Sequence, residues 1–237
     1  MIEQIQAYEM FKQDPILSCE LLEQQGNSNR IYLVTTAINR YLVRQFQITL
    51  DRAVEFKIQQ KAFKANIGAK PMLLDREKGL MITSFIDGRH KHRLSQQELK
   101  KMAQLLKKLH AIRVRLKRNS FKKNFSFRDK KVKHAFIRLD KYPKEYALGH
   151  NDLHPQNIIF QHRQIKLIDW EYARYSDIYF DLVSILIEYK LNPNDQRLFL
   201  RSYFGKKKIN PHKIHAYRLI YKELWQLWFK KLERGEL

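Results

Sequence analysis

The chain has 237 residues, of which 44% are hydrophobic and 30% are charged, with only 7 glycines and 6 prolines. This composition excludes a fibrous or globally disordered chain, and the length allows one large domain or two lobes. The single cysteine, Cys19, excludes a disulfide within the chain. No signal peptide follows Met1, and no apolar run is long enough to span a bilayer, so we expect a cytoplasmic protein without a transmembrane segment.

The chain is strongly basic, with 46 Lys and Arg against 24 Asp and Glu and a formal net charge of +22. Such a balance suits a nucleic acid, an anionic membrane surface or an anionic substrate such as ATP. Much of the excess lies in Arg113–Lys144, where only Asp129 and Asp140 are acidic. No recognised nucleic-acid module accompanies this segment. A solvated basic face is therefore the simpler interpretation, and we expect no specific nucleic-acid partner.

The first third of the chain predicts strands around one helix. Ile31–Val34 and Tyr41–Phe46 are β-rich runs that predict a hairpin. The apolar spacing of Asp51–Phe63 predicts a helix, for which Asp51 can serve as the cap. Met72–Asp75 and Leu80–Phe85 predict a second hairpin. We therefore expect a small β-rich N-lobe with one main helix.

The rest of the chain predicts a larger and mostly helical C-lobe. Ser95–His110 predicts a helix with a capping box formed by Ser95 and Glu98. Two short apolar runs then surround a turn at 161–164. Three further helices are predicted over Ile178–Tyr189, Asp195–Phe204 and His212–Leu232. The expected fold class is α+β, with a bilobal architecture, lobes at 1–86 and 87–237 and a hinge near Ser84–Gly88.

One segment carries a pattern of catalytic residues. It places Asp152 five residues before Asn157, and Asp169 follows twelve residues later, after the predicted hairpin. This order is typical of the protein-kinase-like fold. Phosphoryl transfer depends on positioning and on neutralising charge, and Mg²⁺ prefers hard oxygen ligands. Asp152 is therefore the predicted base, and Asn157 and Asp169 are the predicted magnesium ligands.

Two histidines flank the predicted base. A metal site made of His150, Asp152 and His154 is an alternative, but it leaves Asn157 and Asp169 without a role. We interpret His150 as a packed, hydrogen-bonded residue. His154 is also interpreted as structural, although its place in the loop would allow a phosphate contact.

The N-lobe contains candidate phosphate-binding residues. The turn cluster Gln25–Asn29 can cover phosphates with backbone amides. Arg44 lies on the predicted strand where protein kinases carry Lys, and a guanidinium pairs with phosphate oxygens in a bidentate manner. Glu55, on the following helix, is the expected partner of Arg44. An exposed Glu55 without a partner is the alternative.

From about Gly26 to Trp228, these motifs resemble the choline/ethanolamine kinase and aminoglycoside phosphotransferase superfamily. The resemblance is carried by Asp169-Trp170-Glu171-Tyr172-Ala173 with Asp177 and Asp181-Leu182, and by Gly26–Asn29, Leu42-Val43-Arg44 and Asp51-Arg52. It implies ATP as co-substrate and Mg²⁺ as cofactor. The implied ATP-binding residues are Asn27, Ser28, Asn29, Leu42, Arg44, Glu55, Ser84, Phe85, Ile86 and Ile168, with the backbone of 84–86 holding the adenine between Leu42 and Ile168.

The resemblance also implies an acceptor site made of Asp152, Glu188, Trp225 and Trp228. π-faces and a carboxylate can recognise a quaternary ammonium, which has no hydrogen to donate. The aromatic stripe over 221–228 has helical spacing and could equally belong to a core. We expect a choline kinase, with thiamine kinase as the closest alternative and ethanolamine or an aminoglycoside as more distant acceptors. A basic nucleic-acid- or membrane-binding pseudokinase is the alternative without catalysis.

Overall fold

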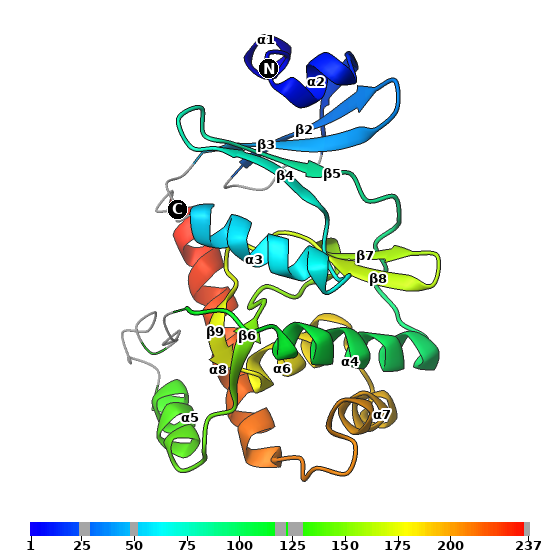
Figure 1. Ribbon diagram of the computed structural model, residues 1–237. Coiled ribbons are helices and arrows are strands. Elements are labelled where there is room, and N and C mark those ends of the chain that lie inside the picture. The colour runs from blue at the N-terminus through cyan, green and yellow to red at the C-terminus, as the bar shows by residue number, and fades with distance from the viewer. Residues whose placement is uncertain (24–28, 48–51, 117–121, 123–129, 235–237) are drawn as a thin grey trace. The chain divides into compact units, whose positions relative to one another are not determined.

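The computed structural model describes residues 1–23, 29–47, 52–116, 122 and 130–234. They form two compact units, Met1–Asp87 and Gly88–Leu237. In Figure 1 the first unit runs from blue to cyan and the second runs from green to the red C-terminal helix. The first contains a five-stranded sheet and the second is mostly helical, which confirms the predicted α+β class.

The sheet of the first unit is antiparallel, with the strand order β1-β2-β3-β5-β4. The elements of this unit are α1 (Ile2–Ile5), α2 (Glu9–Gln13), β1 (Ile16–Leu21), β2 (Asn29–Thr36), β3 (Arg40–Phe46), α3 (Arg52–Lys64), β4 (Pro71–Asp75) and β5 (Leu80–Ser84). Both predicted hairpins and the predicted helix are confirmed. The proposed cap Asp51 lies outside the described residues.

The N-terminal helices and the edge strand β1 were not predicted. β1 pairs with β2, but its side chains do not alternate between buried and exposed, and Leu17 and Leu21 are exposed. The usual period-two signal of a strand is therefore absent. The helices contribute Ile5 and Phe11 to the core, and the Phe11 ring meets the edge of Tyr41 at 5.5 Å between centroids. This packing closes one face of the sheet.

The second unit contains five helices of more than two turns among its described residues. Its elements are α4 (Gln96–Ala111), α5 (Lys130–Asp140), β6 (Tyr146–Gly149), the 3₁₀ helix η2 (Pro155–Asn157), β7 (Ile158–Gln161), β8 (Gln164–Leu167), β9 (Arg174–Asp177), α6 (Tyr179–Glu188), α7 (Pro193–Phe204) and α8 (Pro211–Glu233). Tyr179–Leu186 of α6 are all buried. α6 is thus a central helix of this unit, as expected for a helix that is apolar on every side.

Three elements of this unit, β6, β9 and α5, also escaped prediction. β6 and β9 form a short antiparallel ladder, and β9 is too polar to show a strand pattern. α5 lies inside the basic segment, yet Val132, Phe136 and Leu139 are buried at helical spacing. The charge of the segment therefore obscured an amphipathic helix, which packs against α8.

A buried ion pair joins the beginning of α8 to the end of β9. Lys213 is 1% exposed, and its Nζ lies 2.9 Å from Oδ2 of Asp177. Nζ also donates to the carbonyl of Pro143 at 3.1 Å. A buried charge of this kind requires close partners, because desolvation is costly.

Among the described helices, none is both long and apolar enough to cross a membrane.

The predicted capping box at the start of α4 is confirmed, and it gives a test of the fold. Glu98 N donates to Ser95 Oγ at 3.3 Å, and Ser95 N donates to the Glu98 carboxylate at 2.9 Å. Ser95→Ala should lower the free energy of unfolding by about 1 kcal/mol, as measured by urea titration. Ser202→Ala is the matched control, because within the described part of the chain the Ser202 hydroxyl donates only to the Leu198 carbonyl of its own helix, α7. Equal effects of the two substitutions would contradict this account.

Candidate active site

The candidate catalytic loop begins where the chain leaves β6 at Gly149. A Cβ atom at this position would lie 2.2 Å from Oγ of Ser176 on the paired strand β9. Real Cβ atoms do not approach another heavy atom so closely, so glycine allows the two strands to pair at the entrance to the loop. The loop itself runs through Asp152 to Asn157 in η2.

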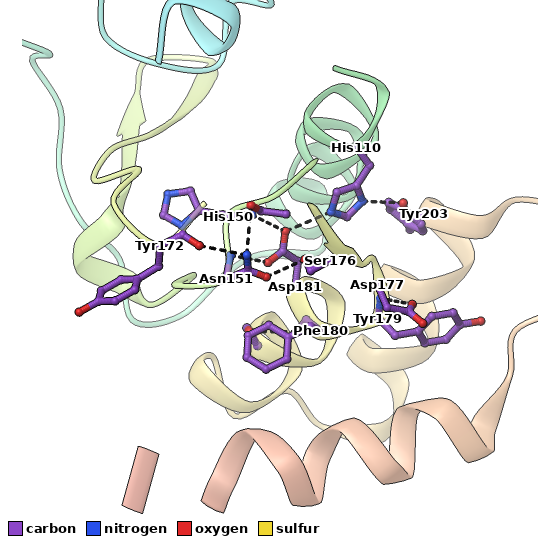
Figure 2. Close-up of polar contacts among 12 residues, drawn as sticks. His110, His150, Asn151, Tyr172, Ser176, Asp177, Tyr179, Phe180, Asp181 and Tyr203 are labelled. Atoms are coloured by element: carbon purple, nitrogen blue, oxygen red, sulfur yellow. Dashed lines mark hydrogen bonds and ion pairs between the residues drawn. The ribbon is translucent and has the colours of Figure 1, made fainter. Parts of the chain in front are cut away.

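Asp181 of α6 fixes the first turn of this loop through hydrogen bonds. The Asp181 side chain is buried, with 1% exposure. Its Oδ2 accepts from His150 N at 2.9 Å, and its Oδ1 accepts from Asn151 N at 2.9 Å. Figure 2 shows both bonds meeting at the one carboxylate. Two backbone donors that would otherwise be buried without partners are thereby satisfied.

His110 of α4 supports the same carboxylate. Its Nε2 lies 3.1 Å from Oδ2 of Asp181, and its Nδ1 lies 2.6 Å from the Tyr203 hydroxyl of α7 (Figure 2). Burial raises the pKa of Asp181. The hydrogen bond and charge of His110 and the hydrogen bond from the Asn151 amide lower it by more, so the net pKa lies below its ordinary value. Asp181 therefore holds the loop as a carboxylate.

Asn151 connects the catalytic loop to the segment after Asp169. Its backbone has φ +65°, in the left-handed region that Asn tolerates better than most residues. Its Nδ2 donates to the Tyr172 carbonyl at 3.1 Å, and its Oδ1 accepts from Ser176 Oγ at 2.7 Å (Figure 2). The residue before the predicted base is thus fixed through both its backbone and its side chain.

Asp152 and Asn157 lie side by side in the loop. Nδ2 of Asn157 donates to the Asp152 carboxylate at 2.7 Å and to the Asp152 carbonyl at 3.0 Å. Asn157 is buried, whereas Asp152 is half-buried. The two bonds use the nitrogen of the amide, so Oδ1 is the atom of Asn157 that can coordinate a cation.

Asp169 follows the hairpin β7–β8 and has φ +63°. The preceding Ile168 donates its N–H to the Asn157 carbonyl at 3.1 Å, and its own carbonyl lies 3.0 Å from Nε2 of His150. His150 is fully buried and packs on the buried Trp170 with ring centroids 4.8 Å apart. These contacts bring Asp169 to the same end of the hairpin as Asn157.

The described residues give no support to the alternative metal site, and His150 and His154 have different environments. His150 has its Nε2 at a backbone carbonyl, and the described residues contain no group of three His, Cys, Asp or Glu placed to bind a metal. Nε2 of His154 lies 3.6 Å from Oδ2 of Asp152. Burial lowers the pKa of His154, the adjacent Asp152 carboxylate raises it, and the net pKa lies above its ordinary value.

The predicted acceptor residues lie close to the loop. Oε1 of Glu188, at the end of α6, accepts from the Tyr221 hydroxyl at 2.9 Å. The Trp225 ring lies edge-on to His154 at 6.2 Å and to Trp228 at 5.6 Å between centroids. Tyr221 is buried as a core residue would be, but both tryptophans are partly exposed. The aromatic stripe therefore divides between the core and the surface beside His154.

In the first unit, Arg44 and Glu55 form the expected ion pair and both are buried. Glu55 also has a second partner, which was not predicted from the sequence. Nη1 of Arg52 lies 2.8 Å from Oε2 of Glu55. Arg52 also donates to Oδ1 of Asn29 at 3.3 Å and lies over the Phe46 ring. Two guanidinium groups thus share one buried carboxylate, which compensates its desolvation.

The remaining residues predicted to bind ATP are placed as follows. Leu42 is half-buried in β3, and Ile168 is half-buried in the second unit. The Ser84 amide donates to the Lys70 carbonyl at 2.8 Å and the Phe85 amide to the Arg40 carbonyl at 2.9 Å, so both are occupied in the first unit. Ile86 is half-buried. Asn27 and Ser28 lie outside the described residues.

Sequence reasoning missed the residues that support the loop. Asp181 entered only as part of a family motif, and Asn151 was not singled out. His110 was predicted as the last residue of a helix, without a role. An acidic residue within the apolar run 178–187 was the available signal for Asp181, since a buried carboxylate needs several donors.

Three features of the chain are typical of kinase-like phosphotransferases. They are a buried Arg–Glu pair in a small sheet-containing unit, an Asp-x₄-Asn loop, and a further Asp after a hairpin. The family described as "Phosphotransferase enzyme family" matches residues 22–217, and the chain belongs to it. This confirms the assignment to the group of choline kinases and aminoglycoside phosphotransferases.

Individual relatives refine this picture. Protein LicA of Haemophilus influenzae is 25% identical over 221 residues, which cover 79% of this chain and 82% of the relative. Thiamine kinase of Escherichia coli is 31% identical over 101 residues, which cover 42% of this chain and 34% of the relative.

Solved structures share the fold. Choline kinase LicA from Streptococcus pneumoniae has a TM-score of 0.83 at 22% identity, covering 99% of this chain and 92% of its own. LicA in complex with AMP has a TM-score of 0.76 at 24% identity, covering 100% of this chain and 89% of its own.

The anchoring carboxylate gives a prediction for stability. Asp181→Asn replaces an acceptor oxygen with an NH₂ group that faces hydrogen donors, and should lower the free energy of unfolding at neutral pH by about 2–3 kcal/mol. The folded-state pKa of Asp181 is lowered, so its stabilisation is present above the unfolded pKa, near 4, and is lost as pH falls through the lower folded value. Urea titrations between pH 3 and 7 should therefore show the variant's deficit shrinking toward acid pH. A deficit that stays constant with pH would contradict this.

Proposed function

We propose that this protein is an ATP-dependent phosphotransferase that phosphorylates the hydroxyl of choline to give phosphocholine. The observation that carries the proposal is that one loop contains the Asp152–Asn157 pair and also contacts the aromatic residues of α8. Asp152 and Asn157 are hydrogen bonded to each other at 2.7 Å, and His154 between them touches Trp225. The proposed base thus shares its loop with a residue that meets an aromatic ring, and such rings suit an alcohol with a cationic head.

In this proposal Asp152 accepts the proton of the attacking hydroxyl. The acceptor oxygen forms a bond to the γ-phosphorus, the bond to the bridging oxygen breaks, and ADP leaves. The hydrogen bond from Asn157 Nδ2 fixes Oδ2 of Asp152 and so orients the carboxylate. Oδ1 of Asp152 is then the atom directed to the hydroxyl.

Asn157 and Asp169 would hold Mg²⁺ through an amide oxygen and a carboxylate. Two such hard oxygen ligands suit magnesium, which completes its shell with phosphate oxygens and water. The fit of Mg²⁺ to this site rests on the side-chain amide of Asn157. Its nitrogen is hydrogen bonded to Asp152, so its oxygen is the atom that can face the ion. When bound, the ion would neutralise charge on the phosphates.

The first unit would bind the rest of ATP. Arg44, held by Glu55, would contact phosphate oxygens, and the turn with Asn27, Ser28 and Asn29 would cover them. Leu42 and the backbone of Ser84, Phe85 and Ile86, which all lie in this unit, are proposed for the adenine. A solved relative in the same fold was crystallised with AMP, which supports a nucleotide co-substrate.

Choline is favoured among the acceptors. LicA of Haemophilus influenzae matches 79% of this chain and the thiamine kinase match covers 42%, while the named function of a structural neighbour is choline kinase. Thiamine is the closest alternative because it too carries an alcohol on a cationic molecule. An aminoglycoside is disfavoured, since a polycation suits a net charge of +22 poorly. A non-catalytic role would not require the Asp152–Asn157 pair.

An ADP-release assay with choline, ethanolamine, thiamine and kanamycin tests the acceptor. The highest kcat/KM should be found for choline. Turnover of thiamine without turnover of choline would contradict the acceptor but not the phosphotransferase reaction. No ADP release with any acceptor, together with salt-sensitive DNA or RNA binding, would favour the basic binding protein.

Removal of the base gives a second prediction. Asp152→Ala should lower kcat by about 10²–10⁴-fold, the usual contribution of a general base. ADP binding measured by calorimetry should change little, because the proposed base contacts the acceptor. Asp140→Asn is the control, since Asp140 is exposed and pairs only with surface lysines among the described residues. A near-wild-type rate for Asp152→Ala would overturn the assignment.

A further inference from the structure

The hydrogen bond between Tyr221 and Glu188 joins the interior of the second unit to its acceptor residues. The Tyr221 hydroxyl lies 2.9 Å from Oε1 of Glu188. Tyr221 is only 2% exposed, and its ring packs on Phe180 with centroids 5.5 Å apart. Glu188 is half-buried at the last position of α6. A rigid core residue thus contacts a carboxylate at the surface of the unit.

The direction of this bond follows from chemistry. A carboxylate can only accept, so the phenol donates its proton to Oε1. Burial and the charge of Glu188 raise the pKa of Tyr221, so the phenol keeps this proton at physiological pH. Because the ring is fixed by packing, the bond fixes the position of Oε1 and leaves Oε2 to face a ligand.

The position of the Glu188 carboxylate, close to the aromatic residues of α8, suits it to meet a ligand. One turn after Tyr221, the Trp225 ring lies 6.2 Å from the Tyr221 ring and 6.2 Å from His154 in the catalytic loop. A glutamate has several rotatable bonds, and holding it in place before a ligand arrives lowers the entropy lost on binding.

We infer that Tyr221 is a positioning residue that holds the Glu188 carboxylate for the cationic head of the acceptor, and so sets the preference for cationic over neutral alcohols. This inference rests on the proposed function. Tyr221 need not touch the acceptor itself. Its effect should appear in discrimination between acceptors, and not in the chemistry at Asp152.

The test compares choline with 3,3-dimethylbutan-1-ol, which has the same shape but a carbon in place of the charged nitrogen. The quantity measured is the ratio of kcat/KM for choline to that for the neutral alcohol. Tyr221→Phe should lower this ratio about tenfold, the order expected for one hydrogen bond to a charged group. The KM for ATP and the kcat at saturating choline should stay within about twofold of wild type.

Tyr217→Phe is the matched control. Tyr217 lies one turn earlier on α8 and is 4% exposed, but burial and the carboxylate of Asp177, not that of Glu188, raise the pKa of its hydroxyl. This variant loses an equally buried hydroxyl and should keep the wild-type ratio. In Glu188→Gln the ratio should also fall, because the negative charge is lost, and adding Tyr221→Phe to it should cause little further loss, because the carboxylate that Tyr221 positions is then already gone.

The outcomes separate the inference from the function it rests on. Wild-type turnover of choline with an unchanged ratio in Tyr221→Phe overturns the inference alone. Equal losses on the cationic and neutral alcohols, matched by Tyr217→Phe, also overturn it, because they would reflect a purely structural role. A wild-type protein that phosphorylates neither choline nor another cationic alcohol contradicts both.

Discussion

The carboxylate of Asp181 is the constraint on which the candidate site depends. It is buried at the centre of the second unit, and it is compensated by His110 and by two backbone amides of the catalytic loop. An isolated buried charge would be strongly unfavourable, so the loop must adopt the conformation that supplies those amides. The stability of the core and the geometry of the loop are therefore set by the same interaction.

The proximity of the candidate catalytic residues could be predicted from sequence because it follows from local order. Asp152 and Asn157 share one loop, and the hairpin β7–β8 returns the chain so that Ile168 bonds the Asn157 carbonyl. Spacing and a turn are enough to predict that proximity. The predicted partner of Arg44 was found in the same way, from a strand followed by a helix.

The supporting contacts could not be predicted because they join residues far apart in the chain. His110 meets Asp181 across 71 positions and Tyr203 across 93. No sequence period links such residues. Local signals failed for other reasons at β1, whose exposed leucines hide its strand character, and at α5, where basic residues surround a narrow apolar stripe. The aromatic stripe of α8 was ambiguous because it contains a core residue, Tyr221, and two partly exposed tryptophans.

The left-handed backbone at Asn151 limits which residues can stand beside the base. Glycine would adopt this conformation freely but would remove the links to Tyr172 and Ser176. Aspartate would keep the acceptor for Ser176 but would set an oxygen against the Tyr172 carbonyl. Most other side chains would strain the backbone as well. Position 151 should therefore accept very few amino acids during evolution, even though its side chain takes no part in the proposed reaction.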